Sequence, residues 1–210
     1  MRNFDIASIL INIIALMIAI IPHEIAHGYV AYLCGDTTAK DDGRLSLNPL
    51  HHIDPIGLIS MLVFRFGWAK AVPINPYRFK GNRKVASLLV SLAGVFTNFI
   101  LGFISGIILV YLNYRSSFLV PLFTSIFWYN IMLGVFNLVP LPPLDGSKVL
   151  ATLLPEDLEY KFYKNEKYFY FVLVIMIFSG VVDKFIAPII ESILKGIIYL
   201  GINLWNTILF

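Results

Sequence analysis

The sequence has almost no cysteine and little charge. Cys34 is the only cysteine among 210 residues, so a disulfide framework is excluded and a lone buried or interfacial thiol is expected. Only 14% of the residues are charged, 58% are hydrophobic, and the mean hydropathy is +0.78. These values exclude a soluble globular domain and predict a polytopic membrane protein. The sequence contains no repeats and no low-complexity tract, and its length leaves room for one compact bundle.

Long apolar runs divide the chain into expected membrane-spanning helices. Four spans are predicted, over residues 6–33, 84–111, 118–139 and 168–182. The last apolar run, residues 185–210, either spans the membrane or lies at its interface as an amphipathic helix. The expected fold is an all-α polytopic membrane protein, a bundle of about four to five transmembrane helices with a short β-hairpin at the membrane interface.

The hairpin is predicted for residues 57–75, where two apolar stretches flank Gly67. Both stretches contain many β-branched and aromatic residues, and the first is too short to span a membrane as a helix. Pro73 limits its strand to an edge position, because proline lacks the N–H that a sheet requires. A re-entrant loop that only packs against the bundle explains the same pattern equally well.

The residues that carry chemistry lie at 22–28, Pro-His-Glu-Ile-Ala-His-Gly, within the first apolar helix. His23 and His27 are four residues apart, so on a helix they share one face, ~6 Å from each other. Two such imidazoles can each give a nitrogen to one zinc ion, and Glu24 can then act as general base on a water. The alternative is a pair of core histidines and a glutamate that hydrogen bonds satisfy. Ionisable groups inside a membrane are costly, which favours the functional interpretation.

A third zinc ligand is expected at Asp145. Residues 140–146, Pro-Leu-Pro-Pro-Leu-Asp-Gly, contain three prolines and cannot form a regular helix. Unwound backbone at membrane depth is tolerated where it is buried or lines a cavity, which suits a carboxylate that binds zinc. The alternative is that Asp145 only caps a helix that runs through Lys148.

The basic residues predict the orientation of the chain in the cell membrane. With the four spans above, the loops at 35–83 and 146–167 share one side, and the N-terminus lies on the other. The loop side holds twelve basic residues and the other side holds Arg2, Arg115 and Lys184. The loops are therefore expected in the cytoplasm and the N-terminus outside. The metal site is expected within the bilayer, towards the cytoplasmic face.

Four stretches together resemble the site-2 protease family of intramembrane zinc metalloproteases. They are residues 23–27, 67–76, 93–99 and 137–146, and the first and last are specific in combination. The resemblance implies one zinc ion per chain, bound by His23, His27 and Asp145, with Glu24 as the base. Val95 stands where the family usually has proline. Neither an inserted PDZ domain nor a C-terminal nucleotide-binding domain is expected, which resembles the minimal prokaryotic branch.

The resemblance also implies where a substrate binds. The hairpin at 57–75 would offer an edge to an unwound substrate by strand addition, with Trp68 and Val72 as candidate substrate-binding residues. Asn98 and Asn137 are expected near the active site, either as contacts to the substrate backbone or as support for the ligands. Residues 1–210 then form a single transmembrane protease domain, with a core at 6–154 and additional C-terminal helices at 168–210.

The expected activity is hydrolysis of peptide bonds within or near the transmembrane segments of membrane proteins. The expected partners are such substrates and the lipid bilayer, with no nucleic acid. A catalytically silent metal-binding membrane scaffold is the alternative, but a structural site needs no base, so the intact Glu24 argues against it. A metal or proton transporter would need polar residues through several spans, on both sides of the midplane, and this sequence has almost none on one side.

Overall fold

The computed structural model describes residues 6–52, 54, 70–115 and 117–209, and all regular structure within these residues is helical. The long helices are α1 (Ile6–Leu33), α4 (Arg83–Tyr114), α5 (Val120–Asn137) and α9 (Val181–Leu209). The shorter elements are α2 (Thr38–Asp41), the 3₁₀ turns η1 (Pro49–His51) and η2 (Pro76–Arg78), α6 (Asp145–Leu153), α7 (Glu156–Lys164) and α8 (Glu166–Phe178). The prediction of an all-α fold is confirmed.

Four of the described helices are long and apolar enough to cross a membrane: α1, α4, α5 and the Val181–Thr207 part of α9. The 32 residues of α4 make it ~48 Å long, more than the ~30 Å hydrocarbon core of a bilayer. Its start is fixed by Asn82, whose side-chain oxygen accepts hydrogen bonds from the backbone N–H groups of Lys84 and Val85. The chain is therefore a multi-pass membrane protein in which α4 is the longest element described.

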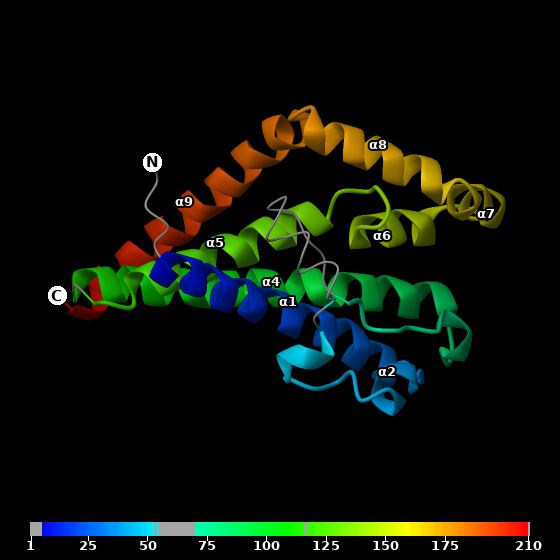
Figure 1. Ribbon diagram of the computed structural model, residues 1–210, viewed down its shortest axis with the longest axis horizontal. Coiled ribbons are helices and arrows are strands. Elements are labelled where there is room, and N and C mark those ends of the chain that lie inside the picture. Colours follow the sequence, from blue (N-terminus) through cyan, green and yellow to red (C-terminus); the bar gives the residue numbers. More distant parts are fainter. Residues whose placement is uncertain (1–5, 53, 55–69, 116, 210) are drawn as a thin grey trace.

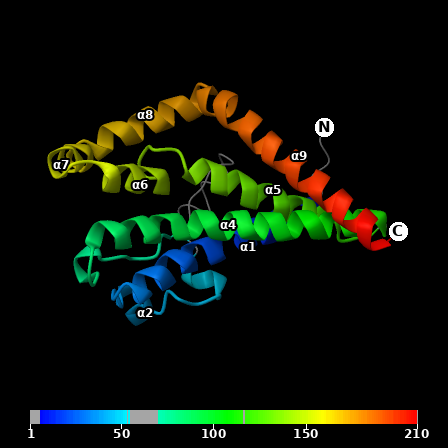
Figure 2. The same cartoon turned by 180° about the vertical axis from the view of Figure 1, so that it is seen from behind.

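Helix α4 lies at the centre of the bundle and contacts α1, α5 and α9 (Figure 1). The chain runs out along α1, back along α4 and out again along α5, so these three helices lie side by side. Figure 2 shows from behind that α9 returns to the end of the bundle where α1 begins. The start of α1 and the end of α9 consequently lie at the same end of the bundle.

Glycines on α4 let the neighbouring helices approach closely. A Cβ atom at Gly102 would lie 2.5 Å from Ile131 Cδ1, and one at Gly106 would lie 2.6 Å from Ile197 Cγ2. These contacts bring α5 and α9 onto α4, as small residues do between membrane helices. The apolar core that results is formed by Phe127, Ile131, Val135, Ile190 and Ile197.

The fourth predicted span, residues 168–182, is wrong. Helix α8 has only 13 residues, ~20 Å in length, and ends at Phe178. Gly180 then adopts a positive φ of 71°, and its N–H bonds to the carbonyl of Ile177, which is a common way to end a helix. The fourth candidate span is instead α9, within the stretch whose position was left open. Hydropathy identified both apolar runs but not the glycine turn that separates them.

The predicted β-hairpin is not borne out. Residues 57–69, including Trp68, lie outside the described part of the chain, and residues 70–75 form no strand. Side chains of α1 and of the loop after it, rather than a partner strand, bind the N–H groups of Val72 and Asn75. A composition rich in β-branched and aromatic residues cannot distinguish strand pairing from an irregular segment.

Candidate metal centre

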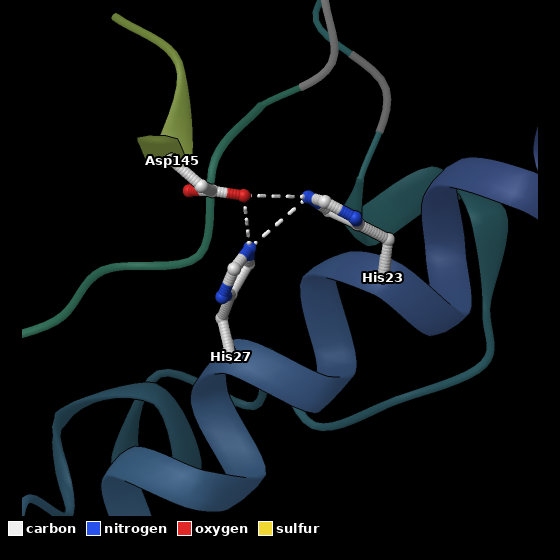
Figure 3. A group of neighbouring side chains, drawn as sticks. All are labelled: His23, His27 and Asp145. Carbon is white, nitrogen blue, oxygen red and sulfur yellow. Dashed lines mark hydrogen bonds and ion pairs between the residues drawn. The ribbon is translucent and has the colours of Figure 1, made fainter. Parts of the chain in front are cut away.

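His23, His27 and Asp145 meet in the interior of the bundle (Figure 3). All three residues are buried, with exposed fractions of 7%, 6% and 5%. The Nε2 atoms of His23 and His27 are 3.0 Å apart. Oδ2 of Asp145 lies 3.2 Å from Nε2 of His23 and 3.0 Å from Nε2 of His27. Three potential ligand atoms therefore form a small triangle that joins α1 to the start of α6.

Asp145 reaches the histidines because the chain turns sharply after α5. Residues 138–144 contain no α-helix, and Asp145 is the first residue of α6. Gly146 packs so closely on the Leu138 carbonyl that a Cβ atom would collide with it. Lys148, one turn along α6, donates a hydrogen bond to Oδ1 of Asp145 at 3.2 Å. Asp145 thus begins the helix without capping it through its side chain, and it turns its second oxygen towards the histidines.

The other ring nitrogens of the histidines face acceptors on α4. Nδ1 of His23 lies 2.6 Å from Oδ1 of Asn98, and Nδ1 of His27 lies 2.6 Å from the carbonyl oxygen of Val90. The amide of Asn98 is oriented by its own donors, because its Nδ2 binds the Ala19 carbonyl and Oδ1 of Asn130, each at 2.9 Å. Its Oδ1 must therefore accept, and both histidines donate from Nδ1.

This tautomer leaves the Nε2 lone pairs of His23 and His27 pointing at a carboxylate oxygen. Oδ2 of Asp145 is buried and has no hydrogen-bond partner. Neutral imidazoles in this tautomer place three acceptor atoms within 3.2 Å of one another with no proton between them. A cation placed between them would satisfy all three atoms, and hydrogen bonds from the far ring nitrogen are the usual support for histidines that bind a metal.

The dimensions and donor types of the cluster fit zinc. Tetrahedral ligands at ~2.0–2.1 Å from zinc are ~3.3 Å from one another, close to the 3.0–3.2 Å separations found here. Two imidazole nitrogens and one carboxylate oxygen are a typical catalytic set, since three protein ligands leave a fourth position for water or substrate. The His23, His27 and Asp145 cluster can thus hold one zinc ion and keep it reactive.

One face of α4 is shaped to receive the two histidines. Val90, Gly94 and Asn98 recur every four residues and so lie in one row along the helix. The outer two bind the histidine rings, and a Cβ atom at Gly94 would lie 2.5 Å from both His23 Cε1 and His27 Nε2. Glycine is required at this position because the rings occupy the space of a side chain.

Glu24 is half-buried next to the cluster and binds backbone rather than a basic side chain. Its Oε2 accepts a hydrogen bond from the N–H of Val72 at 2.8 Å. The predicted substrate-binding residue Val72 is therefore in direct contact with the predicted base. Asn137 is the last residue of α5 and has no side-chain hydrogen bond in the described structure, and Trp68 lies outside the described residues.

The segment that contains Val72 is also held at its far end by Asp36. This residue follows α1, is completely buried, and accepts hydrogen bonds from Thr38 and from the N–H of Asn75, the latter at 2.6 Å. Burial raises the pKa of Asp36, but the hydrogen bonds from Thr38 and Asn75 and the charge of Arg78 outweigh it, so the pKa lies below its usual value.

Sequence reasoning missed Asn130, Asp36 and the contribution of the Val90 carbonyl. Asn130 is fully buried in α5, accepts from Asn98 and donates to the Ile126 carbonyl. Its position as an amide within an apolar span was the available signal. Asp36 stands in a turn-rich stretch where acidic residues are common, and a backbone carbonyl leaves no mark in the sequence.

Comparison with known proteins identifies related chains. The profile described as Peptidase family M50 matches residues 113–180, which include Asp145. YwhC of Bacillus subtilis (strain 168), named as a zinc metalloprotease, is 40% identical over 87% of this chain and 89% of its own. Zinc metalloprotease MJ0392 of Methanocaldococcus jannaschii is 28% identical over 73% of this chain and 37% of its own. No solved structure matches.

Proposed function

Because the chain belongs to peptidase family M50, the site-2 protease family, we propose that it hydrolyses peptide bonds within or near the transmembrane segments of other membrane proteins. The chain is a zinc metalloprotease of a membrane-embedded family, and four of its described helices can cross a bilayer. The observation that carries the proposal is the buried cluster of His23, His27 and Asp145 within these helices. A protease centre in that position reaches peptide bonds that soluble proteases do not.

We assign His23, His27 and Asp145 as the zinc ligands and Glu24 as the general base. The support is the convergence of three acceptor atoms and the histidine tautomers that Asn98 and Val90 impose. Zinc bound there supplies Lewis acidity, which makes a water more acidic and a scissile carbonyl more electrophilic. Asn98 and Val90 keep both Nδ1 protons in place, so the Nε2 lone pairs remain available throughout the reaction.

Glu24 moves the proton in this mechanism. One carboxylate oxygen is fixed by the Val72 N–H, while Oε1 makes no hydrogen bond with any residue that the structure describes. The fixed oxygen orients the group, and the other is available to take a proton from the attacking water and return it to the leaving amine. Neighbouring positions in α1 for Glu24 and His23 keep the base beside the metal ligands.

The substrate is proposed to bind along residues 70–75. A transmembrane helix hides its carbonyls in hydrogen bonds, so the scissile segment must unwind and its freed groups need new partners. Within residues 70–75, Asn75 has extended dihedral angles, and the N–H and C=O of Ile74 have no partner in the described chain. An extended substrate can pair there beside Glu24, with strand addition as the mode of recognition.

The proposed orientation places the N-terminus outside the cell. With α1, α4, α5 and α9 as spans, residues 34–82 and 138–180 share one side, and Arg2 and Arg115 lie on the other. Lys184, which the sequence prediction counted with Arg2, lies in the first turn of α9. The shared side, with the adjoining first turn of α4, carries Lys40, Arg44, Arg65, Lys70, Arg78, Lys80, Arg83, Lys84, Lys148, Lys161, Lys164 and Lys167. This excess supports a cytoplasmic position for that side and for the nearby metal centre.

The decisive test is Glu24→Gln in purified protein. Glutamine has nearly the same size, and its carbonyl oxygen can still accept the Val72 N–H, so folding and zinc content should be unchanged. It cannot accept the proton from water, so cleavage of a tagged transmembrane substrate should fall by ~10²–10⁴-fold. Glu191→Gln, at an exposed carboxylate of α9, is the matched control and should cleave normally. Near wild-type cleavage by folded, zinc-loaded Glu24→Gln protein would remove Glu24 from the mechanism.

A further inference from the structure

Arg44 is a buried cation without a carboxylate partner among the residues that the structure describes. Its exposed fraction is 7%, and it forms no ion pair with any residue in the described ranges. Its Nε has no hydrogen-bond partner, while its Nη2 donates to the carbonyl oxygens of Lys70 at 2.6 Å and Ala71 at 3.3 Å. Burying a guanidinium that has no ion pair and an unbonded Nε costs folding free energy. We therefore expect a role of Arg44 other than stabilising the fold.

The carbonyls that Arg44 binds belong to residues at the surface of the molecule. Lys70 and Ala71 are both exposed, so burial of these residues does not by itself demand a charged partner for their backbone. The contribution of Arg44 is therefore to the position of this backbone rather than to its solvation. A guanidinium suits that task, because its donors form a rigid planar fork.

The peptide group that Arg44 holds is the one that Glu24 binds. The carbonyl of Ala71 and the N–H of Val72 belong to one planar unit, in which a trans peptide points the oxygen and the hydrogen in opposite directions. Arg44 contacts the oxygen of this unit, and Oε2 of Glu24 accepts from its N–H at 2.8 Å. Fixing the plane at its oxygen therefore fixes the direction from which the N–H meets Glu24. A cation at the carbonyl also polarises the peptide and strengthens the N–H as a donor.

We propose that Arg44 is a positioning residue for catalysis, which orients Glu24 through the Ala71–Val72 peptide group. The inference rests on the proposed function, since it takes Glu24 as the base. Arg44 acts through one peptide group and has no hydrogen bond to the proposed zinc ligands. Its loss should lower the rate of the chemical step while leaving the metal centre intact.

The test compares Arg44→Met, Arg44→Lys and the control Arg115→Met in purified protein. Methionine keeps the length and burial of the arginine stem but has no donor, and lysine restores a donor without the fork. Arg115 is an exposed arginine at the end of α4, where its side chain lies over the ring of Tyr111. Zinc content, thermal midpoint, kcat and KM are measured on the same preparations with one tagged transmembrane substrate, alongside wild type and Glu24→Gln.

Arg44→Met should bind zinc fully and melt at or above the wild-type temperature, because an unpaired buried charge has been removed. Its kcat should fall about 10- to 100-fold, the loss expected when a reacting group is displaced by ~1 Å. KM should change much less than kcat, Arg44→Lys should recover part of the loss, and Arg115→Met should match wild type.

The proposal is overturned if kcat per zinc-loaded molecule of Arg44→Met stays within about twofold of wild type. It is also overturned if the loss of activity only follows loss of zinc or of folded protein, since that is the behaviour of a structural residue. If Arg44→Met does not fold, the kcat of Arg44→Lys decides by the same criteria. An active Glu24→Gln protein would instead defeat the proposed function, so the two failures are distinguishable.

Discussion

The substitution Gly94→Ala tests the metal centre without changing any proposed ligand. Gly94 lies on α4 between the residues that bind the two histidine rings. The added methyl group would lie 2.5 Å from His23 Cε1 and from His27 Nε2. The second of these atoms is one that we assign to zinc, so the clash falls directly on the metal-binding face of the imidazole.

The size of the effect follows from these distances. Ordinary carbon contacts are ~3.5–4.0 Å, so each ring must move by about 1 Å to accept the methyl group. Metal ligands are held to within ~0.2 Å of their working distances, so a displacement of that size cannot be absorbed without loss. Overpacking a well-filled core costs ~1–3 kcal/mol. If that strain is relieved in the zinc-free protein, zinc affinity falls about 5- to 150-fold, at 1.4 kcal/mol per factor of ten.

The assay is competition for zinc against a chelator of known affinity, with cleavage measured on the same protein. Gly102→Ala, on the same helix, controls for overpacking, because its Cβ would press on Ile131 of α5 rather than on a histidine ring. Gly196→Ala in α9 meets no atom within 4 Å and controls for helix propensity. Wild-type zinc affinity and cleavage in Gly94→Ala would refute the assignment of the His23 and His27 rings to the metal centre.

Three further predictions concern the ligand set, the topology and a buried carboxylate. Asp145→Ala should lose most of its zinc, and full zinc retention in a metal analysis would exclude Asp145 as a ligand. In a Cys34→Ser background, an impermeant maleimide added to intact cells should label Asn113→Cys but not Asn82→Cys, and the reverse pattern would overturn the orientation. Because the pKa of Asp36 is lowered on folding, its carboxylate stabilises the protein above the unfolded-state pKa of ~3.9, and this stabilisation is lost as the pH falls through the lower folded value. Asp36→Asn should therefore lose ~1.5–3 kcal/mol at pH 7 and progressively less below pH ~4 in thermal unfolding, and a pH-independent difference would contradict this.

The sequence predicts those parts of the site that local geometry determines. The spacing of His23 and His27 fixes their shared face once α1 forms. A carboxylate in a proline-rich turn of an apolar chain is costly to bury without a partner, which favours a position beside the histidines. Asn98 was predicted near the centre by resemblance, with either substrate contact or support as its role. The structure gives it a contact with the His23 ring and no exposed surface.

Contacts between side chains and backbone could not be predicted. Arg44, Asp36 and Glu24 all bind peptide groups of residues 70–75, and a peptide group has the same donor and acceptor whatever residue carries it. Residue types alone therefore do not indicate which side chains hold residues 70–75, and the composition of this segment suggested strand pairing instead. The error over the fourth span has a similar origin, since a backbone dihedral at Gly180 decides where α8 ends.

Because Val90, Gly94 and Asn98 form one row on α4, the metal centre depends on the register of α4 against α1. Each turn of α4 advances 5.4 Å, and a slide of one residue moves it by 1.5 Å and rotates it by about 100°. Such a slide against α1 would remove both ring acceptors and bring a side chain into the space at Gly94. Any influence that shears these two helices, including a bilayer of unsuitable thickness, would thus weaken zinc binding while each helix remained intact.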